Sequence, residues 1–208
     1  MSTNIISASV VKDLRSRTGA GIMDCKDALK NCDGNLDDAI DFLRKKGIAK
    51  AEKKSGRQAE QGTVLSYIHP GNRIGVLVEV NCETDFVAKT DDFLNLVRNI
   101  AMQIAATNPI SLDRNSIDKA KIEKEKQILL EQAKTSGKPE TILEKIVDGK
   151  IEKYFQENCL IEQPYIKDND KSVQDILTES IATLGENISI ARYSRFEVGD
   201  STVSNNSN

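Results

Sequence analysis

The first fifty residues carry apolar side chains at the three- and four-residue spacing that is typical of short amphipathic helices. We predict three helices in this segment. The first is capped by Ser7 and runs to about Arg17, and the second ends at Gly34. The third is capped by Asn35 and ends at Gly47, so the three form a small bundle with a thin core. The positions expected to face that core are Val10, Val11, Leu14, Ile22, Cys25, Leu29, Leu36, Ala39, Ile40, Leu43 and, at the end of the second helix, Cys32.

At Gly62 the pattern changes to the alternation of a β-hairpin. Residues 64–69 are predicted as the first strand, and residues 70–73 carry the Pro, Gly and Asn of a turn. Residues 74–80 alternate between inward and outward positions, which indicates a half-buried strand.

A polar loop is predicted over residues 81–90, followed by a helix over residues 91–106 that the Asn108-Pro109 pair ends. The inward positions of this helix are Phe93, Val97, Ile100, Ala101 and Ile104. Residues 116–158 are charged and helical, and Gly137-Lys138-Pro139 divides them into a helical hairpin that Pro164 ends.

A last helix over residues 172–184 precedes a strand over residues 188–196, which is expected to pair with the hairpin as the third strand. The fold class is therefore α+β: a small helical bundle joined to a core with a three-stranded antiparallel sheet and a helical hairpin. We divide the chain into the bundle (1–47), a linker (48–61), the core (62–199) and a polar tail (200–208) that is expected to be disordered.

The connector after the bundle is strongly basic. Residues 44–57 contain seven basic side chains and one acidic one. One interpretation is a contact with an acidic protein or with RNA, and the other is a solvated linker or linker helix, which we favour. The whole chain has 29 Lys and Arg against 32 Asp and Glu, with only 4% aromatic residues. This balance argues against direct nucleic-acid binding.

Enzyme signatures are missing from the sequence. A partial G-x-G-x-x-G motif has Asp24 at its third glycine position, and neither a phosphate-binding loop nor a G-x-S-x-G motif occurs. A zinc site would require three of the four cysteines to converge on His69, and a Cys–His pair could use only that histidine. We therefore predict no catalytic residue, no metal site and no cofactor. With no apolar run near the roughly 20 residues of a membrane span and no secretory signal, we expect a cytoplasmic protein away from membranes.

Two segments place large apolar residues in unusual positions. Phe86 and Val87 lie in the polar loop beside Asp85, either as a staple for the following helix or as an anchor presented to a partner. Ile22 and Met23 follow a glycine-rich turn, where Ile22 fits the core stripe and Met23 does not. Both could pack within the bundle, or Met23 could serve an adaptable binding surface.

Residues 14–29 (LRSRTGAGIMDCKDAL) resemble the N-terminal signature of the elongation factor Ts family, and residues 79–89 (EVNCETDFVAK) resemble its second signature. Residues 136–139 and 195–199 are similar to its C-terminal landmarks, in the family's order. The resemblance implies a guanine-nucleotide exchange factor that binds GDP-bound elongation factor Tu, displaces Mg²⁺ and accelerates GDP release.

The resemblance also implies two contact regions. A bundle similar to a ubiquitin-associated domain docks on the GTPase domain, and a loop inserts near the nucleotide and displaces the Mg²⁺. By residue match, the bundle contacts are Lys12, Leu14, Arg15, Ile22 and Met23, and the loop residues are Thr84, Asp85, Phe86 and Val87.

A single copy of the core resembles the short form of the family, which implies a possible homodimer. The host compartment is then the bacterial cytoplasm, or the stroma of an organelle that encodes its own copy. Two rival hypotheses stay open: a ubiquitin-associated-type scaffold or interaction module without exchange activity, and an enzyme with a diffuse carboxylate site.

Overall fold

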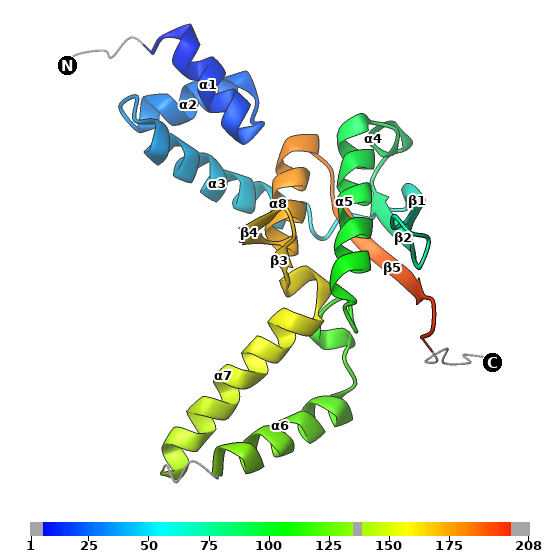
Figure 1. The fold of residues 1–208 in the computed structure, drawn as a ribbon. Helices are drawn as coiled ribbons and strands as arrows, with labels where there is room; N and C mark the ends of the chain where they lie inside the picture. Colours follow the sequence, from blue (N-terminus) through cyan, green and yellow to red (C-terminus); the bar gives the residue numbers. More distant parts are fainter. Residues whose placement is uncertain (1–5, 135–138, 201–208) are drawn as a thin grey trace. The chain divides into compact units, whose positions relative to one another are not determined.

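The computed structural model describes residues 6–134 and 139–200, whose helices and strands follow the chain in Figure 1. The α-helices are α1 (Ala8–Thr18), α2 (Ile22–Asn31), α3 (Leu36–Glu52), α4 (Asp85–Ala88), α5 (Asp91–Thr107), α6 (Lys119–Lys134), α7 (Glu140–Asn158) and α8 (Val173–Leu184). The strands are β1 (Gln61–Ile68), β2 (Ile74–Cys82), β3 (Pro164–Tyr165), β4 (Asp168–Ser172) and β5 (Ile188–Glu197), with short 3₁₀ turns η1 (Arg114–Ser116) and η2 (Leu160–Glu162). The predicted α+β class is confirmed.

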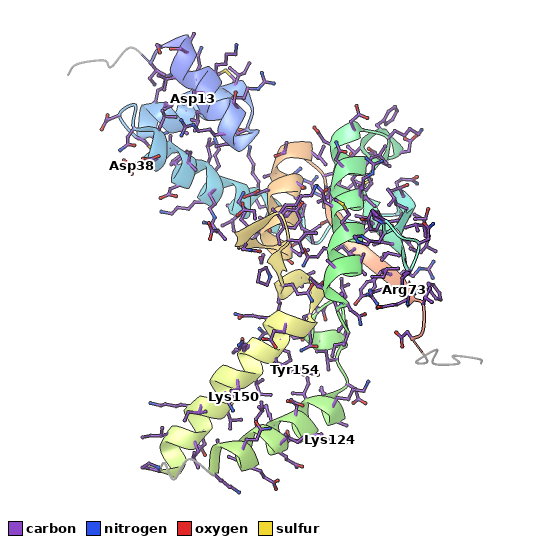
Figure 2. All side chains as sticks on the ribbon, in the orientation of Figure 1. Asp13, Asp38, Arg73, Lys124, Lys150 and Tyr154 are labelled. Carbon is purple, nitrogen blue, oxygen red and sulfur yellow. The ribbon has the colours of Figure 1, made fainter. Side chains whose placement is uncertain are left out.

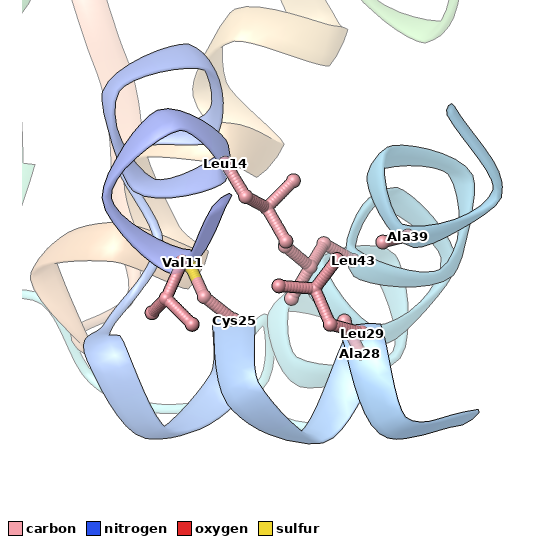
Figure 3. Close-up of a cluster of buried hydrophobic side chains, with 7 residues drawn as sticks. All are labelled: Val11, Leu14, Cys25, Ala28, Leu29, Ala39 and Leu43. Carbon is pink, nitrogen blue, oxygen red and sulfur yellow. The ribbon is translucent and has the colours of Figure 1, made fainter. Parts of the chain in front are cut away.

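Helices α1, α2 and α3 form the predicted N-terminal bundle. Ser7 caps α1 by accepting the Val10 N–H at 3.4 Å, and Asn35 caps α3 by accepting the N–H groups of Asp37 and Asp38. Both predicted caps are confirmed. Figure 3 shows the buried side chains that the three helices share, which are Val11, Leu14, Cys25, Ala28, Leu29, Ala39 and Leu43.

Three details of the bundle differ from prediction. Helix α2 ends at Asn31, because Gly34 lies in the following turn with a φ of 84°. Helix α3 does not end at Gly47 but continues to Glu52. A Cβ at Gly47 would lie 3.4 Å from that of Ala182, so this glycine permits close packing inside a helix rather than ending it. Ile22, predicted to face the core, begins α2 and is 51% exposed.

The predicted three-stranded sheet, in which the last strand pairs with the hairpin, is confirmed, and its order is β1-β2-β5. The His69 N–H donates to the Ile74 carbonyl at 2.9 Å and closes the β1–β2 turn, where Asn72 has a φ of 55°. Strand β1 begins three residues before the predicted strand, and β2 extends past the predicted end to Cys82. The inward positions of β2 are its buried Val76, Val78 and Val80.

The other side of the sheet, called here the outer face, carries exposed apolar side chains. A Cβ on Gly75 would lie 3.1 Å from Cδ1 of Ile68, so Ile68 crosses β2 on this side. Arg192 of β5 pairs there with Glu79 of β2 at 2.7 Å. Since alternate residues share a face, the exposed apolar residues of the outer face are Val64, Ile68, Leu77 and Phe196.

Helix α5 buries all five side chains predicted to face inward, Phe93, Val97, Ile100, Ala101 and Ile104. Its Gln103 is also buried and fully engaged. The Nε2 group donates to the Gln163 side chain and to the Pro164 carbonyl, and Oε1 accepts the Ile166 N–H. Satisfying a buried amide in this way fixes the segment after α7 against α5.

The segment after residue 163 contains a two-stranded sheet that the sequence analysis missed. Strand β3 pairs antiparallel with β4, with Pro164 opposite Ser172. The prediction that Pro164 only ends the helical unit is therefore incomplete, since it also begins a strand. Residues 168–172 (DNDKS) lack the apolar alternation that marks a strand, so the sequence pattern does not predict this pairing.

Helices α6 and α7 form the predicted helical hairpin around their own buried cluster, which is Ile117, Ala133, Leu143, Val147, Ile151, Phe155 and Cys159. Lys124 and Lys150 are exposed on its surface, whereas Tyr154 packs against the cluster (Figure 2). The predicted break at Gly137-Lys138 lies outside the described residues. Arg114 pairs with Glu152 and Glu162 and lies 4.7 Å from the Phe155 ring, which ties the base of the hairpin together.

The contacts divide the chain into two compact units. One contains the described residues of Met1–Thr63, Val80–Leu96 and Asp175–Ser189, and the other those of Val64–Glu79, Val97–Gln174 and Ile190–Asn208. Within the described ranges, none of the helices combines the length and the apolar character needed to cross a membrane. Of the tail predicted to be disordered (200–208), residues 201–208 lie outside the described residues. The predicted domain boundaries stay predictions.

Candidate functional site

The segment predicted as a polar loop over residues 81–90 is more ordered than expected. Its first two residues complete β2, and Asp85–Ala88 form the single helical turn α4. Thr84 caps this turn in an extended conformation, and its Oγ1 accepts the Val87 N–H at 3.4 Å. Thr90 closes the other end by donating to the Val87 carbonyl at 2.8 Å, and it also accepts the N–H of Phe93 in α5.

Phe86 projects from this turn into solvent and is 80% exposed. The staple hypothesis is therefore wrong for Phe86, and its anchor alternative fits the structure. Val87 is half-buried and Ala88 is buried, so the opposite side of α4 holds the turn on the protein. A large apolar ring in solvent on a backbone fixed at both ends is a typical binding anchor.

Asp85 places a negative charge next to Phe86 in the sequence, and an ion pair holds it in place. Its Oδ2 pairs with Nζ of Lys89 at 2.6 Å, and both side chains are at least half exposed. The hydrogen bond and the charge of Lys89 hold the pKa of the Asp85 carboxyl below its usual value. The carboxylate therefore stays ionised beside Phe86 at neutral pH.

Two glutamates connect the loop to the turn after α8. Each lies in one of these segments and accepts hydrogen bonds from the other. Glu186 accepts the Thr84 N–H at 3.0 Å and the Thr84 hydroxyl at 2.6 Å. Glu83 in turn accepts the Asn187 N–H at 2.7 Å. That N–H, followed by the charge of Arg57, lowers the pKa of Glu83. Each turn is thus held by a carboxylate from the other.

The basic linker, meaning here residues 44–57, ends at this same junction. The Asn187 side chain donates to the carbonyls of Ser55 and Arg57, and Lys54 donates to the Gly185 carbonyl. Arg57 also pairs with Glu83 at 3.5 Å. Within the described chain, the linker therefore docks on the turn that holds Thr84.

Most of the linker's basic side chains have partners inside the chain. Lys46 and Lys50 both pair with Asp24 at 2.8 Å, which fixes α2 against α3 and lowers the pKa of Asp24. Arg44 lies 3.8 Å from Asp175. Together with the continuation of α3 to Glu52, these pairs support the linker-helix interpretation over a dedicated contact with RNA or acidic protein.

The structure separates the predicted bundle contacts into two kinds. Lys12 and Arg15 are exposed and lie three residues apart on α1, and Ile22 and the 68% exposed Met23 begin α2. Leu14 is 0% exposed in the bundle core. It therefore supports the bundle, while the other four residues are free to meet a partner.

The thiols and carboxylates do not form a metal centre in the part of the chain that is described. No group of three or more His, Cys, Asp or Glu side chains there could hold a metal ion. The four cysteines are free thiols, and Cys25, Cys82 and Cys159 are buried. Burial raises the pKa of Cys159 to about 11. A zinc site is therefore not formed by the described residues.

A family model described as Elongation factor TS matches residues 48–200, which is well over half of the 208 residues. The chain belongs to the elongation factor Ts family. The elongation factor Ts of Syntrophomonas wolfei is 59% identical over 196 residues, covering 94% of this chain and 92% of that protein. Those of Thermoanaerobacter sp. (strain X514) and Desulfosudis oleivorans are 58% and 56% identical, each over 94% of this chain and over 96% and 98% of their own lengths.

Membership of the elongation factor Ts family makes this chain a translation elongation factor. The matched range includes the Phe86 turn and the Glu186 turn. Sequence reasoning singled out the former and missed Glu186, Asn187 and Arg57. The only available signal was the position of Glu83 within the second signature, because Glu186 and Asn187 are about a hundred residues away in the chain and Arg57 is 26 residues away.

Proposed function

We propose that this chain is a guanine-nucleotide exchange factor that binds GDP-bound elongation factor Tu and accelerates GDP release, so that GTP can rebind during translation elongation. The observation that carries the proposal is the exposure of Phe86 on a turn capped at both ends. That turn lies in the segment that resembles the second family signature, within the range that the family model matches.

In the proposed mechanism a side chain inserts into the GTPase and displaces its groups, and no covalent bond is made or broken. Phe86 inserts beside the nucleotide site of the GTPase, with Thr84, Asp85 and Val87 around it. Mg²⁺ requires near-ideal octahedral geometry, so a small displacement of its ligands releases the ion. Loss of the ion removes positive charge from the GDP phosphates, and GDP then dissociates faster.

The cycle requires no catalytic residue from this chain. If the factor weakens GDP binding, GDP weakens factor binding by the same ratio. Incoming nucleotide therefore releases the factor, and no covalent bond is made or broken. The factor acts as a binding protein, not as an enzyme in the usual sense.

The N-terminal bundle supplies the second contact, as a ubiquitin-associated-like domain on the GTPase domain. Its exposed Lys12, Arg15, Ile22 and Met23 combine positive charge with apolar surface. Met is suited to adaptable surfaces because its side chain is unbranched and polarisable. Leu14 acts from inside, by keeping α1 packed on its neighbours.

We also propose that two copies of the chain associate through the outer face of the sheet. Exposed Val64, Ile68, Leu77 and Phe196 form a concentrated set of apolar side chains there. Adjacent exposed apolar residues on a sheet face are typical of protein interfaces. The Arg192–Glu79 pair gives the same face a polar border that can fix the orientation of the second copy.

The test is release of a fluorescent GDP analogue from elongation factor Tu, with no addition, with this chain, and with its Asp85→Ala/Phe86→Ala form. We expect strong acceleration by the natural chain and little by the double variant. Acceleration by both would leave exchange in place and overturn the role of the loop. No acceleration by the folded natural chain would overturn exchange and favour the scaffold alternative.

A further inference from the structure

Helix α4 cannot hold its own conformation. It has four residues, far fewer than an isolated helix needs. Phe86, its largest side chain, is 80% exposed and adds little packing. The presentation of the ring therefore depends on the contacts that fix the ends of the turn.

The contact at the start of the turn comes from Glu186. Both carboxylate oxygens are used on one residue: Oε2 accepts the Thr84 N–H at 3.0 Å, and Oε1 accepts the Thr84 hydroxyl at 2.6 Å. Donating its proton to Glu186 leaves the Thr84 oxygen to accept the Val87 N–H. Charge-assisted bonds of this kind are stronger than neutral ones. A glutamine side chain has one oxygen acceptor and an NH₂ group that only donates, so it cannot accept both bonds from Thr84, and it carries no charge.

Glu186 is itself held in place on both sides. Gly185 before it has a φ of 79°, and its carbonyl accepts from Lys54. Asn187 after it is buried, with its N–H on Glu83 and its side chain on the Arg57 carbonyl at 2.7 Å. The carboxylate therefore projects from a backbone that has little freedom to move away from Thr84.

We propose that Glu186 is a positioning residue for exchange, which raises the fraction of molecules whose Thr84–Val87 turn presents Phe86 ready to insert. This inference rests on the proposed function. A flexible turn has to be ordered at the moment of insertion, and the observed rate falls with the fraction that is competent. Glu186 orders the turn in advance through its two bonds to Thr84, and this role requires no contact with the nucleotide or the metal.

The variant that tests this is Glu186→Gln, which keeps the size of the side chain and removes its charge. Glu144→Gln, on the exposed side of α7, is the matched control. GDP release is measured over a range of factor concentrations. We expect the maximal rate to fall about tenfold with Glu186→Gln, the loss of a charge-assisted bond. The concentration for half-maximal rate should change less than about twofold, because the bundle contact is intact.

Amide hydrogen exchange of residues 84–90 in the isolated chain gives a second measurement that does not depend on the GTPase. We expect faster exchange in Glu186→Gln with an unchanged rate in the bundle, and the control should match the natural chain. An unchanged maximal rate, or unchanged exchange at 84–90, overturns the inference. A chain that fails to accelerate GDP release overturns the proposed function instead, and the amide measurement still reports whether Glu186 orders the turn.

Discussion

Thr84 is hydrogen-bonded to Glu186 through its backbone N–H and its hydroxyl, although 102 residues separate the two along the chain. The same hydroxyl caps the turn that carries Phe86. The local geometry of the second family signature thus depends on a turn near the C-terminus. Thr84 therefore connects the turn that carries Phe86 to Glu186, in addition to lying in the proposed contact segment.

Replacement of Thr84 by Val should slow exchange while leaving the chain folded. Valine keeps the branched shape and the backbone N–H bond to Glu186 but loses the hydroxyl bond to Glu186 and the cap, a cost of about 1 kcal/mol, which corresponds to roughly a fivefold change. Thr84→Ser, which retains the hydroxyl, should remain within about twofold of the natural chain. The measurement is the maximal rate of GDP release. Equal rates for Val and Ser would contradict the role of the hydroxyl.

Leu14→Ala should destabilise the bundle, because Leu14 is fully buried among the side chains of the three helices. We expect a loss of about 2–5 kcal/mol in the free energy of unfolding of that segment. The exposed Met23→Ala should change it by less than about 0.5 kcal/mol and weaken partner binding instead. Urea titrations followed by circular dichroism and binding titrations check both. A stable Leu14→Ala bundle with weakened binding would make Leu14 a direct contact.

Acid should weaken the contacts of Glu83 with Asn187 and Arg57. Its pKa is lowered from 4.5 in the folded chain, chiefly by the Asn187 N–H. A lowered folded pKa means that its contribution to stability is present above the unfolded pKa and is lost as the pH falls through the folded value. The melting temperatures of the natural chain and Glu83→Gln should therefore differ at pH 7 and converge as the pH falls through the lowered folded pKa. A constant difference across this range would show that the Glu83 charge plays no part.

The proposed dimer should dissociate when the outer face of the sheet is charged. Phe196→Glu places a carboxylate among exposed apolar side chains, and its burial in an interface is unfavourable. Lys150→Glu on the hairpin is the control, because Lys150 lies on α7, away from the sheet residues in the chain. Sedimentation equilibrium should give a dimer for the natural chain and the control, and a monomer for Phe196→Glu. A natural chain that is monomeric at all concentrations would refute the association.

The elements with local signals were predictable from the sequence. Ser7 and Asn35 cap their helices through neighbours two or three residues away, and Phe93 follows the period of one helix. The alternation in β2 and the turn at residues 70–73 likewise depend on adjacent residues. Such features are encoded within a few residues of where they act.

The predictions that were wrong or missing concern features that depend on partners distant in sequence. Gly47 was predicted to end a helix because its close approach to Ala182 is invisible locally. The polar strand β4 has no strand pattern of its own. The exposure of Phe86 and the bond between Thr84 and Glu186 became visible only in the fold, because the sequence around Phe86 is equally compatible with a buried and an exposed ring.

The most direct test of the central claim is the dependence of exchange on Mg²⁺. GDP release from elongation factor Tu is measured with Mg²⁺ and with the ion removed by EDTA, each with the natural chain, Phe86→Ala, or no addition. If Phe86 acts by displacing the ion, the natural chain should accelerate release strongly only when Mg²⁺ is present, and Phe86→Ala should accelerate it little in either condition. Equal acceleration by the natural chain with and without Mg²⁺, or full acceleration by Phe86→Ala, would contradict the account.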